Sequence, residues 1–284
     1  MAIIVNTNIS SLVSQRNLTN ATNSLNTALQ RMSTGYKINS AKDDAAGLYI
    51  ATNLDTQIRG SKVAQTNVET GSNLLTVAEG DLDVIKTNLQ RIRDLAVQAS
   101  NGVYSDESMK AMEDEVTARA AEITRVATAS KFNGLELLSG NDLGQNGLRL
   151  QVGANAEEAQ NALMIDKSVF AASDADTLGL DGAIGDAFAN ATAAAAFITT
   201  LDTALENINT RKSQIGAYQN RLESAATSLV TNIENSSAAK STIMDADIAE
   251  ESSNYTKASI LQQTSAALLT QANQLPALAL QLIG

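Results

Sequence analysis

The C-terminal stretch, residues 260–283, has a leucine at every seventh position and carries no charge. The row consists of Leu261, Leu268, Leu275 and Leu282. Because a spacing of seven places side chains on one line of an α-helix, this row predicts a seam that faces another helix. A helix alone in water normally has a charged face opposite its apolar face, but no charged residue follows Lys257. We therefore expect a helix that needs partners to bury its leucines.

A membrane-spanning helix is the alternative interpretation of so apolar a stretch. Polar side chains and a proline interrupt every run that would be long enough to cross a bilayer. These residues are Gln262, Gln263, Gln271, Asn273, Gln274 and Pro276. The sequence therefore predicts no membrane insertion.

The N-terminal segment has the same character as the C-terminal one. Leu18, Leu25 and Met32 are seven residues apart, and the first acidic residue of the chain is Asp43. Two charge-poor heptad segments at opposite ends of one chain are predicted to pair with each other. The predicted assembly seam thus contains Leu18, Leu25, Met32, Leu261, Leu268, Leu275 and Leu282.

The residue types that are missing exclude several classes of function. The chain has no Cys and no His, so it has no thiolate nucleophile, no imidazole base and no Cys/His metal site. Lys+Arg 20 against Asp+Glu 31 gives a net charge of −11, which argues against nucleic acid as a partner. An enzyme would have to rely on carboxylates alone.

Four carboxylate groups are the remaining candidates for acid–base or metal chemistry. They are Asp43-Asp44, Asp106-Glu107, Asp245 with Asp247, and Glu250-Glu251. None has the spacing of a calcium-binding loop, and solvated or ion-paired carboxylates are the favoured interpretation. We expect no catalytic residues, no cofactor and no metal, and a hinge role with subunit contacts for Lys42-Asp43-Asp44.

The pattern in the middle of the chain predicts a rod of long helices with one solvent-exposed face. Within residues 45–101, both heptad rows are apolar over the four heptads from Leu75 to Ala99, with Leu75, Leu82 and Leu89 in one of them. A shorter helix is predicted after Ser105, and a third long helix resumes by about Thr192. The fold class is therefore mainly α, with nested, long antiparallel coiled-coil-like helices.

A small β-hairpin is predicted between these helices. Leu148, Leu150 and Val152 alternate with polar or small residues, and residues 163–165 could supply the returning strand. The predicted organisation is a terminal layer of 1–44 with 241–284 and a rod of 45–179 with 192–240. Residues 180–191 are glycine- and alanine-rich and are predicted to be a short exposed outer connection.

Several motifs, in order along the chain, resemble bacterial flagellin. They are Val5-Asn-Thr-Asn8, the run from Gly35 to Leu48, Leu89 to Gln98, Lys131-Phe-Asn-Gly134, and Ile260 to Pro276. The resemblance covers the chain apart from its glycine-rich centre. The chain departs from many relatives in its short centre and in its last residues, Leu-Ile-Gly284.

This resemblance implies a structural subunit that self-assembles into the filament of the bacterial flagellum, for swimming. A hook–filament junction protein of the same superfamily is the alternative. The implied partners are copies of the chain itself, a flagellar export chaperone, the type III export apparatus, and the filament cap and hook-associated proteins. The implied location is the extracellular filament, reached without a cleaved signal peptide. Arg91, Leu95 and Glu115 match positions at which an animal Toll-like receptor senses flagellins, and they are also candidate protofilament contacts.

Overall fold

The computed structural model describes residues 7–283, apart from the side chains of residues 158–159 and 275–283. The chain forms two compact units, one of residues 1–56 with 235–284 and one of residues 57–234. From the sequence, these boundaries were predicted between residues 44 and 45 and between residues 240 and 241. Residues 45–56 and 235–240 were predicted as parts of the rod and instead belong with the terminal helices. Within this unit, Lys240 Nζ lies 2.5 Å from Asp55 Oδ1.

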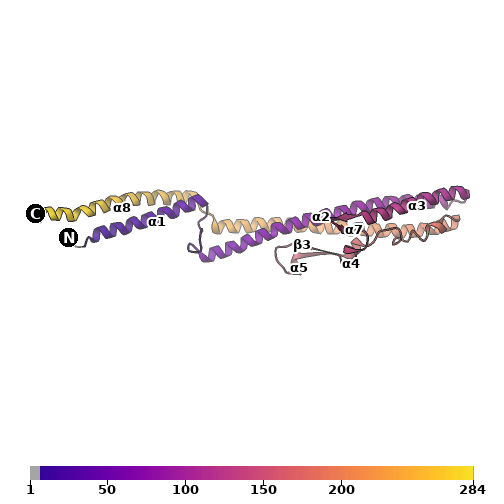
Figure 1. Cartoon of the computed structure of the whole chain (residues 1–284), viewed down its shortest axis with the longest axis horizontal. Helices are drawn as coiled ribbons and strands as arrows, with labels where there is room; N and C mark the ends of the chain where they lie inside the picture. Colours follow the sequence, from indigo (N-terminus) through magenta and orange to yellow (C-terminus); the bar gives the residue numbers. More distant parts are fainter. Residues whose placement is uncertain (1–6, 284) are drawn as a thin grey trace. The chain divides into compact units, whose positions relative to one another are not determined.

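The terminal unit is built on two long helices, α1 (Ile9–Thr34) and α8 (Ile248–Ile283). They lie side by side, as Figure 1 shows, so the predicted pairing of the two ends is confirmed. The Asn8 side chain accepts a hydrogen bond from Ser11 N and caps the start of α1. Gly35, with φ 74°, ends α1 in the left-handed conformation that glycine adopts without strain.

The rod unit contains most of α2 (Ala45–Ala99) and α7 (Ala191–Met244), together with α3 (Asp106–Ala129). The predicted heptad rows are buried and form one core cluster that all three helices share. Lys212 and Gln219 interrupt the apolar row of α7. Each bonds an acidic residue of α2, Lys212 to Asp83 and Gln219 to Glu79, so the interruptions are polar bridges between the two helices.

The predicted hairpin is present as β3 (Leu148–Gln151), which pairs antiparallel with β4 (Ala162–Ile165). A second hairpin, β1 (Lys131–Phe132) with β2 (Leu135–Glu136), was not predicted. Its turn residues Asn133 and Gly134 have φ of 48° and 84°. An Asn-Gly pair is the sequence signal for such a turn. Three short helices complete this region: α4 (Asp142–Asn146), α5 (Glu158–Asn161) and η1 (Lys167–Phe170).

The prediction that residues 180–191 form an exposed connection was wrong for about half of the segment. The short helix α6 (Ile184–Ala187) contacts α3, and Leu180, Ile184 and Phe188 are buried. Phe188 also makes an edge-on contact with Phe197 of α7, with ring centroids 6.4 Å apart. A single helical turn is too short to show a period in the sequence, so its apolar residues gave no signal. Gly182 and Gly185 are exposed, as predicted.

Candidate assembly surface

Most of the fully buried residues of the α1–α8 pair have small side chains. Ala21 and Ala28 are the buried residues of α1, and Ala258, Ser265 and Ala272 are buried on α8 at intervals of seven. Small residues allow two helices to approach closely, but they remove little apolar area from water. The fully buried seam of the pair is therefore narrow.

The predicted leucine rows lie beside this seam. On α1, Leu18, Leu25 and Met32 are half-buried. On α8, Leu261 and Leu268 are 48% and 61% exposed, so about half of each side chain is left uncovered within the subunit. The side chains of Leu275 and Leu282 lie outside the described residues. The role of these rows in assembly therefore stays a prediction.

Further apolar residues of the terminal unit are exposed and were not singled out from the sequence. They include Ile9, Leu12, Val13, Leu29 and Ile260. Leu12 and Leu29 fall outside the heptad row on which the sequence argument relied. A count of every large apolar residue on the helix, whatever its heptad position, would have found them.

A groove of about 840 Å³ runs between α1 and α8. Leu261 and Leu268 line it on the α8 side, and Asn20, Ser24 and Thr27 line it on the α1 side. Because apolar side chains stand opposite small polar ones, the groove offers an apolar contact with hydrogen-bonding groups at its edge.

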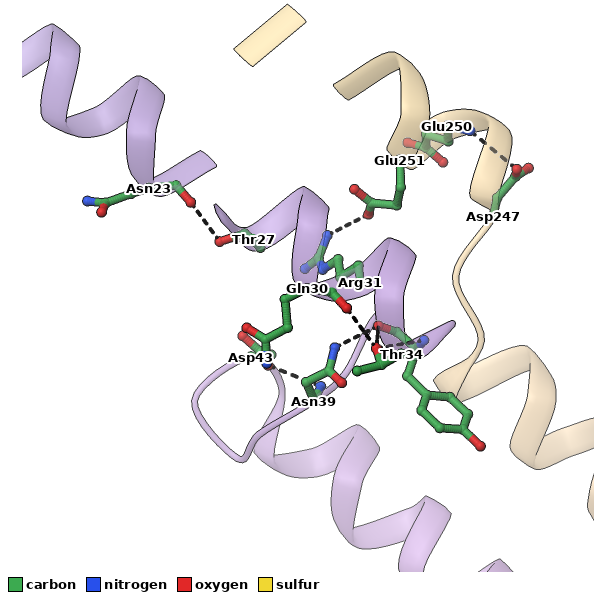
Figure 2. A network of polar contacts seen from close by, with 11 residues as sticks. Asn23, Thr27, Gln30, Arg31, Thr34, Asn39, Asp43, Asp247, Glu250 and Glu251 are labelled. Atoms are coloured by element: carbon green, nitrogen blue, oxygen red, sulfur yellow. Dashed lines mark hydrogen bonds and ion pairs between the residues drawn. The ribbon is translucent and has the colours of Figure 1, made fainter. Parts of the chain in front are cut away.

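The two ends of the α1–α8 pair are held by polar contacts. At the end near the start of α1, Asn8 Nδ2 donates to Ala272 O at 2.7 Å. At the other end, Arg31 Nη1 lies 2.9 Å from Glu251 Oε1 (Figure 2), and the Glu251 side chain is 10% exposed. Lys37 N donates to Met244 O and Ala246 N donates to Gly35 O, which ties the two connecting segments into a short bridge.

The predicted hinge carboxylates are used locally. Asp43 Oδ2 accepts from the Ser40 hydroxyl and from the backbone N–H of Asn39 and Ser40, and these bonds lower the pKa of Asp43. Asp44 caps the start of α2 through Ala46 N and Gly47 N.

The Asp247 carboxylate caps α8 in the same way, through Ala249 N and Glu250 N. Figure 2 shows the bond to Glu250. Over the described residues, no group of three or more acidic side chains could hold a metal ion. None of the described helices combines the length and hydropathy that a bilayer crossing needs.

The second set of predicted residues lies on the rod and is split between surface and core. Arg91 Nε lies 3.1 Å from Glu115 Oε1, and Arg119 Nε lies 3.0 Å from the same oxygen. The Arg91 bond and then the Arg119 bond lower the pKa of Glu115. Leu95 is only 3% exposed and belongs to the rod core. In this structure Leu95 can support a surface contact only by holding α2 in place.

Comparison with known proteins gives two matches to family models. The model described as the bacterial flagellin N-terminal helical region matches residues 5–142. The model described as the bacterial flagellin C-terminal helical region matches residues 198–283. The two matches flank the β3–β4 hairpin and the short α6 segment.

Full-length relatives are found among curated proteins. The flagellar filament 30.7 kDa core protein of Treponema maltophilum is 38% identical over 280 residues, which cover 95% of this chain and 96% of the relative. Flagellin FlaB1 of Treponema pallidum is 35% identical over 281 residues, with the same coverage of both chains. Flagellin B of Vibrio cholerae is 33% identical over 379 aligned positions that span both chains completely.

A solved structure with the same fold is also found. A proposed flagellar hook-associated protein from Vibrio parahaemolyticus aligns with a TM-score of 0.60 at 16% identity. The alignment covers 72% of this chain and 100% of that one. At this identity the likeness concerns the fold alone.

Proposed function

Because this chain belongs to the bacterial flagellin family and is a structural subunit of the flagellar filament, we propose that copies polymerise through the terminal helices α1 and α8. The observation that carries this proposal is the exposure of Leu261 and Leu268 on a helix that has no charge after Lys257. Family members polymerise, so the partner for this surface is the terminal pair of another copy.

The burial of apolar side chains favours such a contact. Burying one leucine side chain contributes about 1.5–3 kcal/mol, and each copy of a repeating interface would bury several. The net charge of −11 makes subunits repel each other. The α1–α8 pair carries few charges, with Arg16 and Arg31 alone on α1. The pairs of two copies can therefore approach each other with little electrostatic repulsion.

Three threonine hydroxyls of the α1–α8 pair already have a hydrogen-bond acceptor within their own helix. Thr19, Thr27 and Thr264 donate to the carbonyl oxygen four residues earlier, each at 3.0 Å. A buried donor without a partner costs about 1–3 kcal/mol. Because these donors already have partners inside their own helix, other copies can cover them without that loss.

A charge placed in the leucine row tests the proposal. We expect Leu268→Asp to abolish filaments, because a buried unpaired carboxylate is strongly unfavourable at every copy of the interface. Asparagine has nearly the shape of aspartate but no charge. We therefore expect Leu268→Asn to polymerise, at a higher protein concentration than the unchanged chain needs. Sedimentation measures the polymer, and circular dichroism checks that the helices persist.

The control is Gly182→Asp, which places the same charge on the exposed segment before α6. It should polymerise like the unchanged chain. Normal filaments from Leu268→Asp would contradict the proposal.

We also propose that the chain leaves the cell by flagellar type III export, with an export chaperone, and assembles together with cap and hook-associated proteins. Family membership is the support for these partners and for the absence of a cleaved signal peptide. Deletion of the export apparatus should leave the chain inside the cell. The hook–filament junction alternative has less support, because the curated relatives are named as filament proteins.

The surface pair Arg91–Glu115 is our proposed contact for an animal Toll-like receptor. Both side chains are accessible, at 48% and 36% exposure. A receptor that binds them must compete with their ion pair. Binding of the monomer to the receptor ectodomain, with Glu115→Ala as the variant, tests this; unchanged affinity would contradict it.

A further inference from the structure

The chain contains three Asn-Gly pairs, each at a turn. They are Asn101-Gly102 after α2, Asn133-Gly134 in the β1–β2 hairpin, and Asn146-Gly147 at the end of α4. All three asparagines are exposed. An asparagine before glycine can react with its own main chain, because the next backbone nitrogen lies close to the side-chain amide carbon and no Cβ shields that nitrogen. The surroundings of the three pairs differ, and they decide which pair can react.

Two of the three glycines are required by the backbone. Gly134 and Gly147 have φ of 84° and 73°, in the left-handed region that glycine adopts without strain. Gly102 is not in that region, and a Cβ built on it would meet no described heavy atom within 4 Å. Alanine would therefore fit at position 102, so the turn after α2 does not need its glycine.

The nitrogen that would attack is also restrained in these two pairs. Gly147 N donates to Leu143 O at 2.8 Å, which engages it in a hydrogen bond. Asn133-Gly134 is the whole turn between Phe132 and Leu135, which are paired across the hairpin. Such a tight turn fixes the dihedral angles of both of its residues. The nitrogen of Gly134 is therefore held and cannot rotate onto the side-chain carbon.

The Asn101-Gly102 pair has neither restraint. Asn101 N donates to Gln98 O at 3.1 Å, and Val103 N donates to Asn101 O at 2.7 Å. Among the described residues, no hydrogen bond involves Gly102 N or the Asn101 side chain. Residues 101–107 are all exposed, so solvent reaches both reacting atoms.

We propose that Asn101 is a site of spontaneous deamidation, through a succinimide ring formed with the backbone of Gly102. The Gly102 nitrogen attacks the side-chain carbonyl carbon of Asn101, the nitrogen loses its proton to water, and the side-chain amide group leaves as ammonia. Water then opens the ring at either of its carbonyls. One opening gives aspartate, and the other gives isoaspartate, in which the main chain runs through the former side chain. Water is the only co-reactant, and the inference does not rest on the proposed function.

The products change the end of α2. Both carry a new carboxylate just beyond Ala99, where α2 ends, and the dipole of a helix disfavours a negative charge at its C-terminus. Asp106 and Glu107 begin α3 on the other side of the same turn and add to the repulsion. Isoaspartate also lengthens the main chain by one carbon atom. The hydrogen bond from Gln98 Nε2 to Tyr104 Oη, which spans the turn at 2.9 Å, should therefore weaken.

Incubation of the full chain in water enriched in heavy oxygen tests the proposal, and mass spectrometry of its peptides locates the product. In the folded chain, Asn101 should be converted first, to a mixture of aspartate and isoaspartate that carries oxygen from that water. Asn133 and Asn146 should be converted many-fold more slowly. In urea, where the turns are lost, all three asparagines should react at similar rates, because only the folded structure distinguishes them.

Gly102→Ala is the matched control. Its methyl group shields the backbone nitrogen and meets no described heavy atom, so this variant should keep its unfolding temperature and lose most of the reaction at Asn101. Three results would overturn the proposal. They are unchanged conversion of Asn101 in Gly102→Ala, conversion of Asn133 or Asn146 in the folded chain as fast as that of Asn101, and conversion of Asn101 to aspartate without any isoaspartate.

Discussion

The carboxylate of Glu136 shows how much one side chain can organise in a loop-rich region. Ser139 Oγ donates to it at 2.6 Å and Asn141 Nδ2 at 3.1 Å, and Lys131 Nζ forms an ion pair with it at 3.0 Å. These bonds, Ser139 first, lower the pKa of Glu136 from 4.5 to about 2. The β1–β2 hairpin is thereby tied to the loop that follows it.

This pKa gives a prediction for acid. Because the folded-state pKa is depressed, the contribution of Glu136 to stability is fully present above pH 4.5 and is lost as the pH falls toward about 2. An NMR titration of the Glu136 carboxyl should have its midpoint near the lower value. In Glu136→Gln, the backbone amides of the β1–β2 hairpin should exchange their hydrogens with solvent faster than in the unchanged chain, already at neutral pH. A titration midpoint near pH 4.5 would contradict the bonds from Ser139, Asn141 and Lys131 to Glu136.

Some residues carry roles that no sequence pattern could reveal. Arg211 Nη1 donates to Ala171 O at 2.8 Å, to Ala172 O at 2.9 Å and to Ser173 Oγ at 2.6 Å, and burial lowers the pKa of Arg211. In the sequence it is one basic residue on a helix. Its role depends on an extended segment that lies about forty residues earlier and is brought to it only by the fold.

At the scale of elements, heptad spacing was a reliable guide to helices and a weaker guide to their contacts. The period predicted α2 and α7 and their buried rows, because long helices repeat the signal many times. In the α1–α8 pair the same reasoning emphasised leucine, whereas alanines such as Ala28 and Ala258 are the fully buried residues. A heptad period alone does not show which of two neighbouring rows faces the partner within the subunit.

Short elements were beyond this kind of prediction. The single turn of α6 and the two-residue strands β1 and β2 are too brief to show a period. The β3–β4 hairpin was predicted because its strand residues alternate over five positions.

The glycines of α2 give a prediction at this scale. Gly60→Ala places a methyl group 2.9 Å from Ala154 Cβ and 3.2 Å from its Cα. A Cβ at Gly80 would meet no described heavy atom within 4 Å. The overpacking should exceed the gain in helix propensity, so the rod should lose about 1–2 kcal/mol relative to Gly80→Ala. Urea unfolding of the two monomers provides the comparison. Equal stability of the two variants would mean that the loop at Ala154 is not held against α2.

At the scale of the whole molecule, the two units divide their apolar surface differently. The rod unit buries its rows in a core shared by α2, α3 and α7. The terminal unit closes a narrow seam of small residues and leaves Leu261 and Leu268 exposed. A subunit with this distribution has its most apolar surface where it carries the fewest charges, which is the arrangement expected of a chain that completes its packing in a polymer.

The most direct test of this account measures whether the leucine row becomes buried when filaments form. The chain has no cysteine, so a single introduced thiol can be followed with a maleimide reagent, and cysteine is apolar enough to replace a buried leucine. We expect Leu268→Cys to react readily in the monomer and many-fold more slowly in sedimented filaments. Gly182→Cys should react readily in both. Equal reaction rates of Leu268→Cys in monomer and filament would contradict the account.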